Sequence, residues 1–222
     1  MANKMNWKPL NLSNLEKENL PEILVVYGTG FPKELGAPAD FLTNSEIIGL
    51  NTGKNTIQNY TRIACRATLR WLLSCYTGIS PTSNQIILNC FGKPCIPDSG
   101  VFFNVTHTSF SFLIGVSVWG RIGTDIELLN GDENIQEISH FAFSDDEKIR
   151  FLNDDDFLEI WTQKEALLKA AGLGLTNNLQ RIDSEKLIKR WGLKAYSFAC
   201  PNQETATVIV RAKSELESVY FI

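Results

Sequence analysis

Gly123-Thr124-Asp125-Ile126-Glu127 is the stretch of this chain that decides the fold, because it combines a strand pattern with a chemical face. Apolar and polar residues alternate across the run Ile122 to Leu128, which predicts a strand. Side chains two apart on a strand share a face, so Asp125 and Glu127 point the same way. Ile126 then points into the packed side. The stretch predicts a strand that presents two carboxylates together.

A second motif supplies a third carboxylate and a lysine. The run from Trp161 to Lys169 (WTQKEALLK), followed by Gly172, predicts a helix with Glu165 and Lys169 one turn apart. Three converging anions repel one another by about 4 kcal/mol per pair at 4 Å and an effective dielectric of 20. Oxygen-only ligands favour Mg²⁺ or Mn²⁺, with positions left for water and a phosphate. The two motifs therefore indicate a site for a hard cation and a phosphate.

Plainer interpretations of the same residues stay open at this point. Asp125 and Glu127 are equally consistent with the solvent face of an edge strand. Glu165 and Lys169 also fit a surface ion pair on a helix, worth about 0.3–0.5 kcal/mol. Only their arrangement in space separates these interpretations from a binding site.

The composition excludes several classes of protein. The chain has 222 residues, 44% hydrophobic and 21% charged, which is typical of an ordinary globular protein. A net charge of −4 argues against a nucleic-acid binder, and no apolar run approaches the roughly 20 residues that span a bilayer. The N-terminus lacks the pattern of a signal peptide, and the five cysteines form no CxxC pair. We expect a cytoplasmic protein with reduced thiols.

Periodicity and turn residues predict the remaining elements. Strands are expected at 22–27, 86–88, 102–107 and 112–119, and helices at 45–50, 55–76, 141–152 and 157–171. Ser144 and Glu147 form a capping-box pattern, and Gly172 suits the end of the last helix. Residues 1–21 are polar and irregular, and residues 178–222 read as strands with turns.

Other polar residues are candidates for phosphate contacts. His107 ends a predicted strand, and Lys93-Pro94 places a cation on a stiff loop. Arg62, Arg66 and Arg70 lie at i, i+4 and i+8, on one face of the helix 55–76. Each has a plain alternative: a structural histidine, a surface lysine and the wet side of a helix.

The order of these motifs resembles the 4′-phosphopantetheinyl transferases, of the type that activates surfactin synthetase. The resemblance runs from about Arg62 to Leu175. It is carried by GKP at 92–94, FNVTHT at 103–108, IGTDIE at 122–127, FS at 143–144 with Glu147, and WTQKEA at 161–166 with Lys169 and GLGL at 172–175. The resemblance implies an α+β monomer of two similar subdomains related by a pseudo-twofold axis. We expect the boundary to give subdomains 1–122, on the nucleotide side, and 123–222, with the metal site.

The family's reaction moves phosphopantetheine from coenzyme A to a serine of an apo carrier protein, releasing 3′,5′-ADP. By position, the resemblance implies that Mg²⁺ is held by Asp125, Glu127 and Glu165. Glu165, or a water that it holds, is the implied base, and Lys169 and His107 are the other implied catalytic residues. The implied coenzyme A contacts are Arg62, Lys93, Pro94, Thr106, His107, Lys164 and Lys169.

The chain departs from the family pattern in one respect. Many relatives carry a basic stretch that binds the 3′-phosphate, but residues 43–48 (TNSEII) hold no cation, which leaves Arg62, Arg66 or Lys54 for that role. A carrier-docking surface is expected around Phe110, Phe112 and residues 141–152. Two other functions remain, a Mg²⁺-dependent coenzyme A pyrophosphatase and a non-catalytic module that binds coenzyme A or a carrier.

Overall fold

The computed structural model describes residues 5–12, 15, 20–51, 57–129, 134–173, 178–211, 213 and 215–222. Lys54, Gly174 and Leu175, which the sequence singled out, lie outside these residues. No helix in the described ranges is long and apolar enough to cross a membrane. All five cysteines are free thiols, as expected, although Cys90 is exposed.

The first half of the chain is an antiparallel sheet packed against a long helix. Strand β6 (Phe112–Ser117) lies between β2 (Ile23–Gly28) and β5 (Phe102–His107). Helix α2 (Ile57–Thr77) packs on β5 and β6 through an apolar stripe that includes Leu69, Leu72 and Leu73, all buried. The shorter helix α1 (Asn44–Asn51) packs against α2.

The second half repeats this topology. Its strands β7 (Gly123–Glu127), β9 (Thr205–Arg211) and β8 (Leu193–Ala199) form an antiparallel sheet with β9 in the middle. Helix α5 (Asp154–Ala171) packs on β7 and β9. Both halves therefore run strand, helix, strand, strand, with the last strand central, and the expected α+β fold of two similar parts is confirmed.

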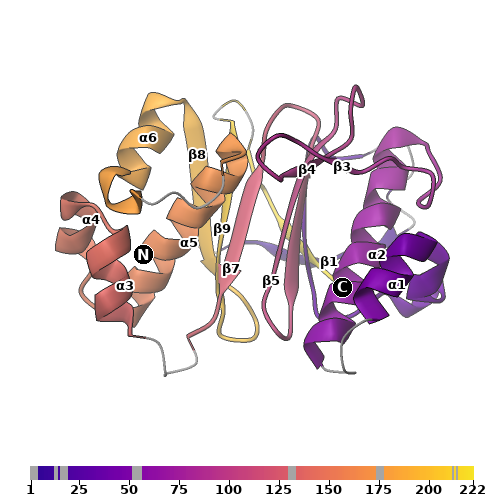
Figure 1. Ribbon diagram of the computed structural model, residues 1–222, viewed down its shortest axis with the longest axis horizontal. Coiled ribbons are helices and arrows are strands. Elements are labelled where there is room, and N and C mark those ends of the chain that lie inside the picture. Colours follow the sequence, from indigo (N-terminus) through magenta and orange to yellow (C-terminus); the bar gives the residue numbers. More distant parts are fainter. Residues whose placement is uncertain are drawn as a thin grey trace.

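The two halves meet along β5 and β7, which contact each other in the middle of the molecule (Figure 1). Helices α2 and α5 lie on opposite outer sides of this junction (Figure 1). The chain's last strand, β10 (Val219–Phe221), pairs with β2 of the first half and with β1 (Trp7–Pro9). The chain therefore returns to the sheet of the first half after forming the second. The predicted boundary between residues 122 and 123 stays a prediction.

Smaller elements complete the chain. Strands β3 (Ile87–Leu88) and β4 (Pro94–Cys95) form a two-stranded ribbon. Helix α6 (Ser184–Arg190) packs against α5 and β8. Short 3₁₀ turns cover Lys33–Leu35, Pro38–Phe41 and Leu179–Arg181.

Three predictions about the elements need correction. The helix predicted over 141–152 is two helices, α3 (Ile135–Ala142) and α4 (Asp145–Arg150). The backbone of Ser144, the N-cap of α4, is extended and separates them. The capping box itself is confirmed. The region 178–222 contains α6 besides its strands, and the first 21 residues include β1. In both regions, tertiary pairing and capping determine structure that periodicity does not reveal.

Candidate functional site

Strand β7 places its carboxylates as the alternation predicts. Ile126 is buried in the core of the second sheet, so Asp125 and Glu127 face the other way, toward α5 and β5. Gly123 allows β7 and α5 to approach closely: a Cβ at this position would stand 2.0 Å from the carbonyl oxygen of Ala166. The missing side chain at Gly123 is therefore what brings the strand carboxylates within reach of the helix side chains.

Asp125 is the most buried member of the site, with 1% of its surface exposed. Its Oδ1 accepts hydrogen bonds from Lys169 Nζ at 2.5 Å and from Thr106 Oγ1 at 3.3 Å. Its Oδ2 is buried and has no hydrogen-bond partner among the described residues. Burial raises the pKa of Asp125, and the positive charge of Lys169 opposes that rise. Asp125 is therefore no solvent-facing residue of an edge strand.

The other two carboxylates are electrostatically coupled to Asp125. Burial, then the charge of Asp125, raises the pKa of Glu127 to about 7, against a hydrogen bond from Trp161. Burial and the charge of Asp125 also raise the pKa of Glu165, while Lys169 opposes the rise. The charge of Asp125 thus raises the pKa of both glutamates, and the charge of Glu165 adds to the rise at Glu127. Three such carboxylates around one lysine carry negative charge that a cation would relieve.

The carboxylates of Asp125, Glu127 and Glu165 are suitable ligands for a hard cation, although they do not converge on one point in this structure. No three Asp, Glu, His or Cys side chains in the described part of the chain already stand in a metal-binding arrangement. The free Oδ2 of Asp125 and the two coupled glutamates are nevertheless the oxygen donors that Mg²⁺ or Mn²⁺ prefers. Lys169 supplies the countercharge in this conformation. Binding of one cation by all three carboxylates would require these side chains to move closer together.

His107 and Thr106 lie at the end of β5, beside this cluster. Thr106 is buried against Asp125, whereas His107 is largely exposed, with Nδ1 3.3 Å from the carbonyl oxygen of Thr108. Partial burial of the imidazole lowers the pKa of His107; the hydrogen bond to Thr108 opposes this, and the charges of Arg62 and Lys169 add to it. Its ring is thus biased toward the neutral form and lies in a positive field.

The arginine face of α2 divides into two parts. Arg66 and Arg70 both pair with Glu46, at 2.6 and 2.5 Å, and Arg70 also donates to two backbone carbonyls. Arg62 is exposed and has no ion pair within the described ranges. Glu46 belongs to the segment 43–48 that the sequence analysis found without a cation. Because Glu46 pairs with Arg66 and Arg70, Arg62 is the arginine of the three that is available to a ligand.

Arg62 and His107 line one pocket of about 430 Å³, together with Glu46 and Arg66. The pocket lies between α1, α2 and the end of β5. Val105 and His107 line it from one face of β5, whereas Thr106 contacts Asp125 from the other face of the same strand.

Two predicted coenzyme A contacts are engaged elsewhere in the protein. Lys93 donates to the carbonyl oxygens of Ile122 and Lys169, at 2.9 and 2.6 Å, and burial lowers its pKa to about 8. Lys164 is buried in an ion pair with Glu147, at 2.7 Å, and donates to two carbonyls. Pro94 lines a pocket of about 200 Å³ beside Lys93. In this conformation both ammonium groups are bound by protein oxygen atoms, and the predicted coenzyme A contacts of Lys93, Pro94 and Lys164 stay predictions.

Sequence patterns missed a buried carboxylate that joins the halves. Glu204, from the turn between β8 and β9, accepts hydrogen bonds from Ser111 Oγ at 2.5 Å and Thr108 Oγ1 at 2.7 Å. Its other oxygen accepts from the hydroxyl of Tyr27 at 3.1 Å. Glu204 thereby holds the turn that follows His107. No sequence motif indicates Glu204. Only the fold shows that it lies next to Tyr27, Thr108 and Ser111.

The fold and site define a two-part α+β protein with an acidic centre and a lysine where its halves meet. Residues 121–207, which include all three carboxylates and Lys169, match the family model described as the 4′-phosphopantetheinyl transferase superfamily. The predicted resemblance is thereby confirmed for this part of the chain, which is similar to that superfamily. The surfactin-synthetase type stays a prediction.

Curated relatives agree with the family match. The chain is 33% identical over 122 residues to 4′-phosphopantetheinyl transferase HetI of Nostoc sp. PCC 7120, covering 50% of this chain and 52% of the relative. It is 31% identical over 137 residues to a putative 4′-phosphopantetheinyl transferase of Synechocystis sp. PCC 6803, covering 57% and 56%. A 4′-phosphopantetheinyl transferase of Bacillus subtilis, ffp, is 33% identical over 93 residues, covering 39% and 40%. The matches thus span about half the length of the first two relatives.

Proposed function

We propose that this protein transfers the 4′-phosphopantetheine arm of coenzyme A to the serine hydroxyl of an apo carrier protein, with release of 3′,5′-ADP. The observation that carries the proposal is the buried Asp125, paired with Lys169 and coupled to Glu127 and Glu165. All four residues lie in the segment that matches the transferase family. Phosphoryl transfer depends mainly on positioning and on neutralising charge, which is what this cluster supplies.

Asp125, Glu127 and Glu165 are the residues that would hold Mg²⁺, or Mn²⁺, in this proposal. The bound cation would neutralise charge on the coenzyme A pyrophosphate. The fit rests on the unpartnered Oδ2 of Asp125 and on the raised pKa values of its two neighbours. The family match itself does not identify the metal.

Glu165 is the proposed base and Lys169 the proposed partner of the leaving group. Burial and the charge of Asp125 raise the pKa of Glu165, which makes its carboxylate a stronger base than a solvated glutamate. The carboxylate, or a water that it holds, accepts the proton of the carrier serine. Lys169 lies one turn along the helix, where its ammonium contacts Asp125, and it would stabilise charge on the departing 3′,5′-ADP.

Arg62, His107 and Thr106 form the proposed phosphate side of the coenzyme A site. Arg62 and His107 line one pocket, and Thr106, the residue before His107 on β5, contacts Asp125. The 3′-phosphate is assigned to Arg62, because Glu46 already pairs with Arg66 and Arg70. Lys93 and Pro94 are proposed to contact the nucleotide through the loop that they stiffen.

The carrier is proposed to dock over α3 and α4. Phe141 and Leu152 are 66% and 82% exposed, and Ile149 and Phe110 are exposed as well. Phe112, which was expected to belong to this surface, is fully buried and is excluded. The monomeric state and the cytoplasmic location stay predictions.

Intact-mass spectrometry of an apo carrier protein, incubated with this protein, coenzyme A and Mg²⁺, tests the proposal. We expect the mass of one phosphopantetheine arm to be added to the serine and to be lost when EDTA is present. Glu165→Gln removes the proposed base and should lower the rate by about 10²–10⁴-fold. Glu159→Gln, on the same helix, is the matched control and should leave the rate unchanged.

Two outcomes would contradict the proposal. Release of 3′,5′-ADP without any carrier would indicate hydrolysis of coenzyme A instead. A folded protein that binds coenzyme A and modifies none of several carrier types would indicate a binding module.

A further inference from the structure

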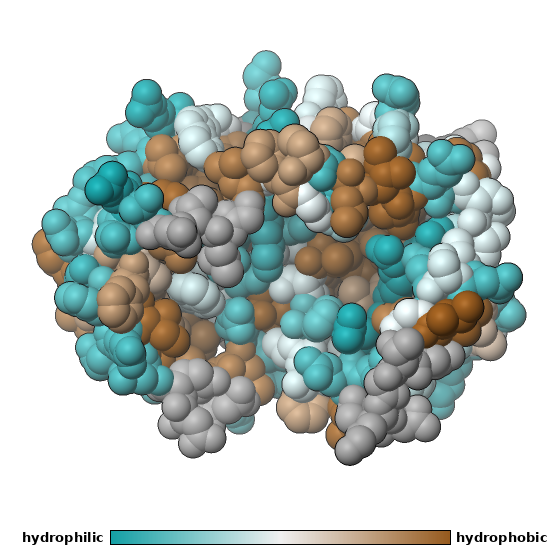
Figure 2. Space-filling model, viewed as in Figure 1, coloured by the Kyte–Doolittle hydropathy of each residue, from teal (hydrophilic) through white to brown (hydrophobic). Residues whose placement is uncertain are grey.

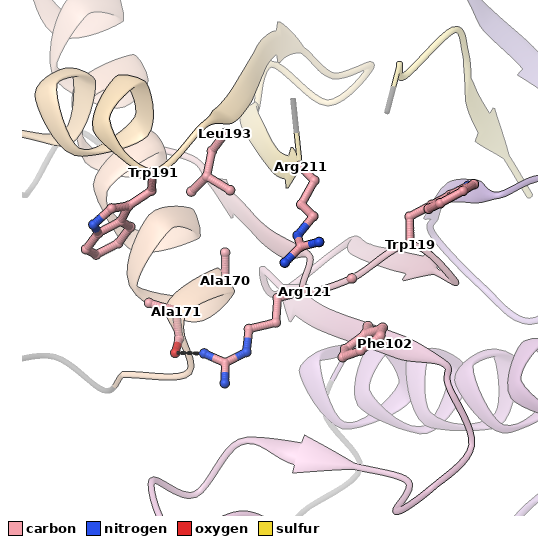
Figure 3. Close-up of a pocket in the computed structure, with 9 residues that line it drawn as sticks. Phe102, Trp119, Arg121, Ala170, Ala171, Trp191, Leu193 and Arg211 are labelled. Carbon is pink, nitrogen blue, oxygen red and sulfur yellow. Dashed lines mark hydrogen bonds between the residues drawn. The ribbon is translucent and has the colours of Figure 1, made fainter. Parts of the chain in front are cut away.

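A separate pocket of about 610 Å³ lies where the two halves meet, at the C-terminal end of α5. Figure 3 shows side chains from both halves around it. Its principal lining residues are Phe102, Trp119, Arg121, Trp191, Leu193 and Arg211. None of the carboxylates or phosphate contacts of the proposed transfer site lines it. Its volume is within the range of small-molecule sites.

The pocket is positively charged within a chain of net charge −4. It is lined by Arg121 and Arg211 and by no acidic residue. Neither arginine has a carboxylate partner in the part of the chain that the structure describes. Two guanidinium groups that face one cavity without a counterion favour an anionic occupant.

A backbone hydrogen bond holds Arg121, and Arg211 packs beside Gly120. Arg121 donates to the carbonyl oxygen of Ala171, at 2.9 Å, drawn as a dashed line in Figure 3. The side chain of Arg211 lies over Gly120, where a Cβ would stand 3.2 Å from Arg211 Cδ. Gly120 has φ +146°, so the position suits glycine for its backbone as well. Both arginines therefore line the pocket with exposed side chains.

The aromatic walls suit a flat apolar body. Trp119 and Trp191 are 54% and 47% exposed, and Phe102 is also exposed. In Figure 3 the two tryptophans lie on opposite sides of the arginine pair. Figure 2 shows that apolar residues gather in the upper middle of this face, where the halves meet. Exposed indole rings beside guanidinium groups are the usual means of binding a planar ring that carries a negative charge.

We propose that this pocket binds a small organic anion, namely a carboxylate, sulfonate or phosphate carried on a flat aromatic ring. The guanidinium groups of Arg121 and Arg211 bind the anionic group, and Trp119 or Trp191 packs on the ring. None of the proposed metal or phosphate residues lines this pocket, although Phe102 and Arg121 also line the smaller pocket of Lys93 and Pro94. The proposal does not depend on whether the protein transfers phosphopantetheine.

Isothermal titration calorimetry with 2-naphthoate tests this inference directly. The neutral amide of the same shape, 2-naphthamide, is the comparison ligand. We expect one site for naphthoate and at least tenfold weaker binding of the amide, because the charge-assisted hydrogen bonds are lost. Arg211→Gln and Arg121→Gln should each weaken naphthoate binding by about tenfold. Trp191→Leu, which keeps apolar volume, should weaken it by about threefold.

Arg181→Gln is the matched control, because Arg181 is an exposed arginine that does not line the pocket. It should leave naphthoate binding unchanged. Equal affinity for acid and amide, or equal losses in the Arg181 and Arg211 variants, would overturn the proposal. So would one-for-one displacement of naphthoate by coenzyme A, which would make the pocket part of the transfer site.

Discussion

The ammonium of Lys169 lies 2.5 Å from Oδ1 of Asp125, so the chain's own lysine neutralises the most buried of three coupled carboxylates. A metal ion that binds the same carboxylates must share Asp125 with this lysine. The other oxygen of Asp125 has no partner among the described residues and is the atom to which a cation would first bind. Lys169 thus both maintains the site without metal and opposes metal binding.

Replacing Lys169 should therefore separate metal binding from transfer. In Lys169→Met we expect Mg²⁺ to bind the protein without coenzyme A at least as tightly as in the unchanged protein, because a competing positive charge is removed. Transfer to an apo carrier should fall by about 10²-fold or more, since the leaving group loses its cation. Calorimetry with Mg²⁺ and intact-mass spectrometry measure the two effects. A parallel loss of both would show that Lys169 only supports the fold.

Asp125→Asn should abolish the response of the protein to Mg²⁺. In the unchanged protein Mg²⁺ is expected to raise the melting temperature, because a ligand that binds only the folded state stabilises it. The amide side chain of the variant offers one weaker oxygen donor, so the increase should disappear while the fold persists. Differential scanning fluorimetry with and without Mg²⁺ measures this. Asp40→Asn, on an exposed 3₁₀ turn, is a control that should keep the full increase.

The local pattern around this site could be predicted from the sequence, whereas its partners could not. Alternation placed Asp125 and Glu127 on one face of a strand, and the Gly172 cap ends α5 as expected, with φ +76°. Those features depend on neighbours in sequence. Glu204 acts through contacts 93 to 177 residues away, and Glu46 binds its arginines 20 and 24 residues away, so no local pattern reveals these pairings.

The positions of the lysines show the same limit. Lys93, Lys164 and Lys169 all lie in the motifs that predict the site, yet Lys93 binds backbone carbonyls and Lys164 binds Glu147. Of these three, only Lys169 faces the carboxylates. A lysine's role depends on which oxygen atoms the fold brings to its ammonium, and that is a tertiary property.

Glu46 should contribute stability that depends on pH. Its carboxylate pairs with Arg66 and with the nearly buried Arg70. Burial acts to raise its pKa, but the hydrogen bonds and charges of these partners outweigh burial and lower the pKa below 4.5. The stabilisation is therefore complete above pH 4.5 and is lost as the pH falls through the folded-state pKa.

Glu46→Gln tests that expectation in urea unfolding. At pH 7 the variant should lose about 2–3 kcal/mol of unfolding free energy, because Arg70 keeps a buried charge without its partner. The difference between the two proteins should shrink below pH 4.5. A difference that stays constant from about pH 7 to about pH 3 would mean that the ion pairs contribute nothing. Glu34→Gln, exposed on a 3₁₀ turn, is the control.

Glu204 should affect both stability and the coenzyme A site. Glu204→Leu leaves the hydroxyls of Tyr27, Thr108 and Ser111 without their acceptor, at a cost of about 2–4 kcal/mol. Glu204→Gln keeps an oxygen for two of them and should cost less. Because the turn that follows His107 loosens, we expect the KM for coenzyme A to rise in the leucine variant. An unchanged KM together with lost stability would restrict Glu204 to the fold.

The role of Lys164 is where the sequence prediction and the contacts in the structure differ most. The motif implied that Lys164 contacts coenzyme A, but its ammonium is buried against Glu147 and two carbonyls. Lys164→Met should therefore lower the unfolding free energy by about 3 kcal/mol, since Glu147 keeps a buried charge without its lysine. The KM for coenzyme A should stay within about twofold. Lys189→Met, on the exposed side of α6, should change neither quantity. A KM that rises at least tenfold in a stably folded Lys164 variant would restore the sequence prediction and require the lysine to leave its ion pair during catalysis.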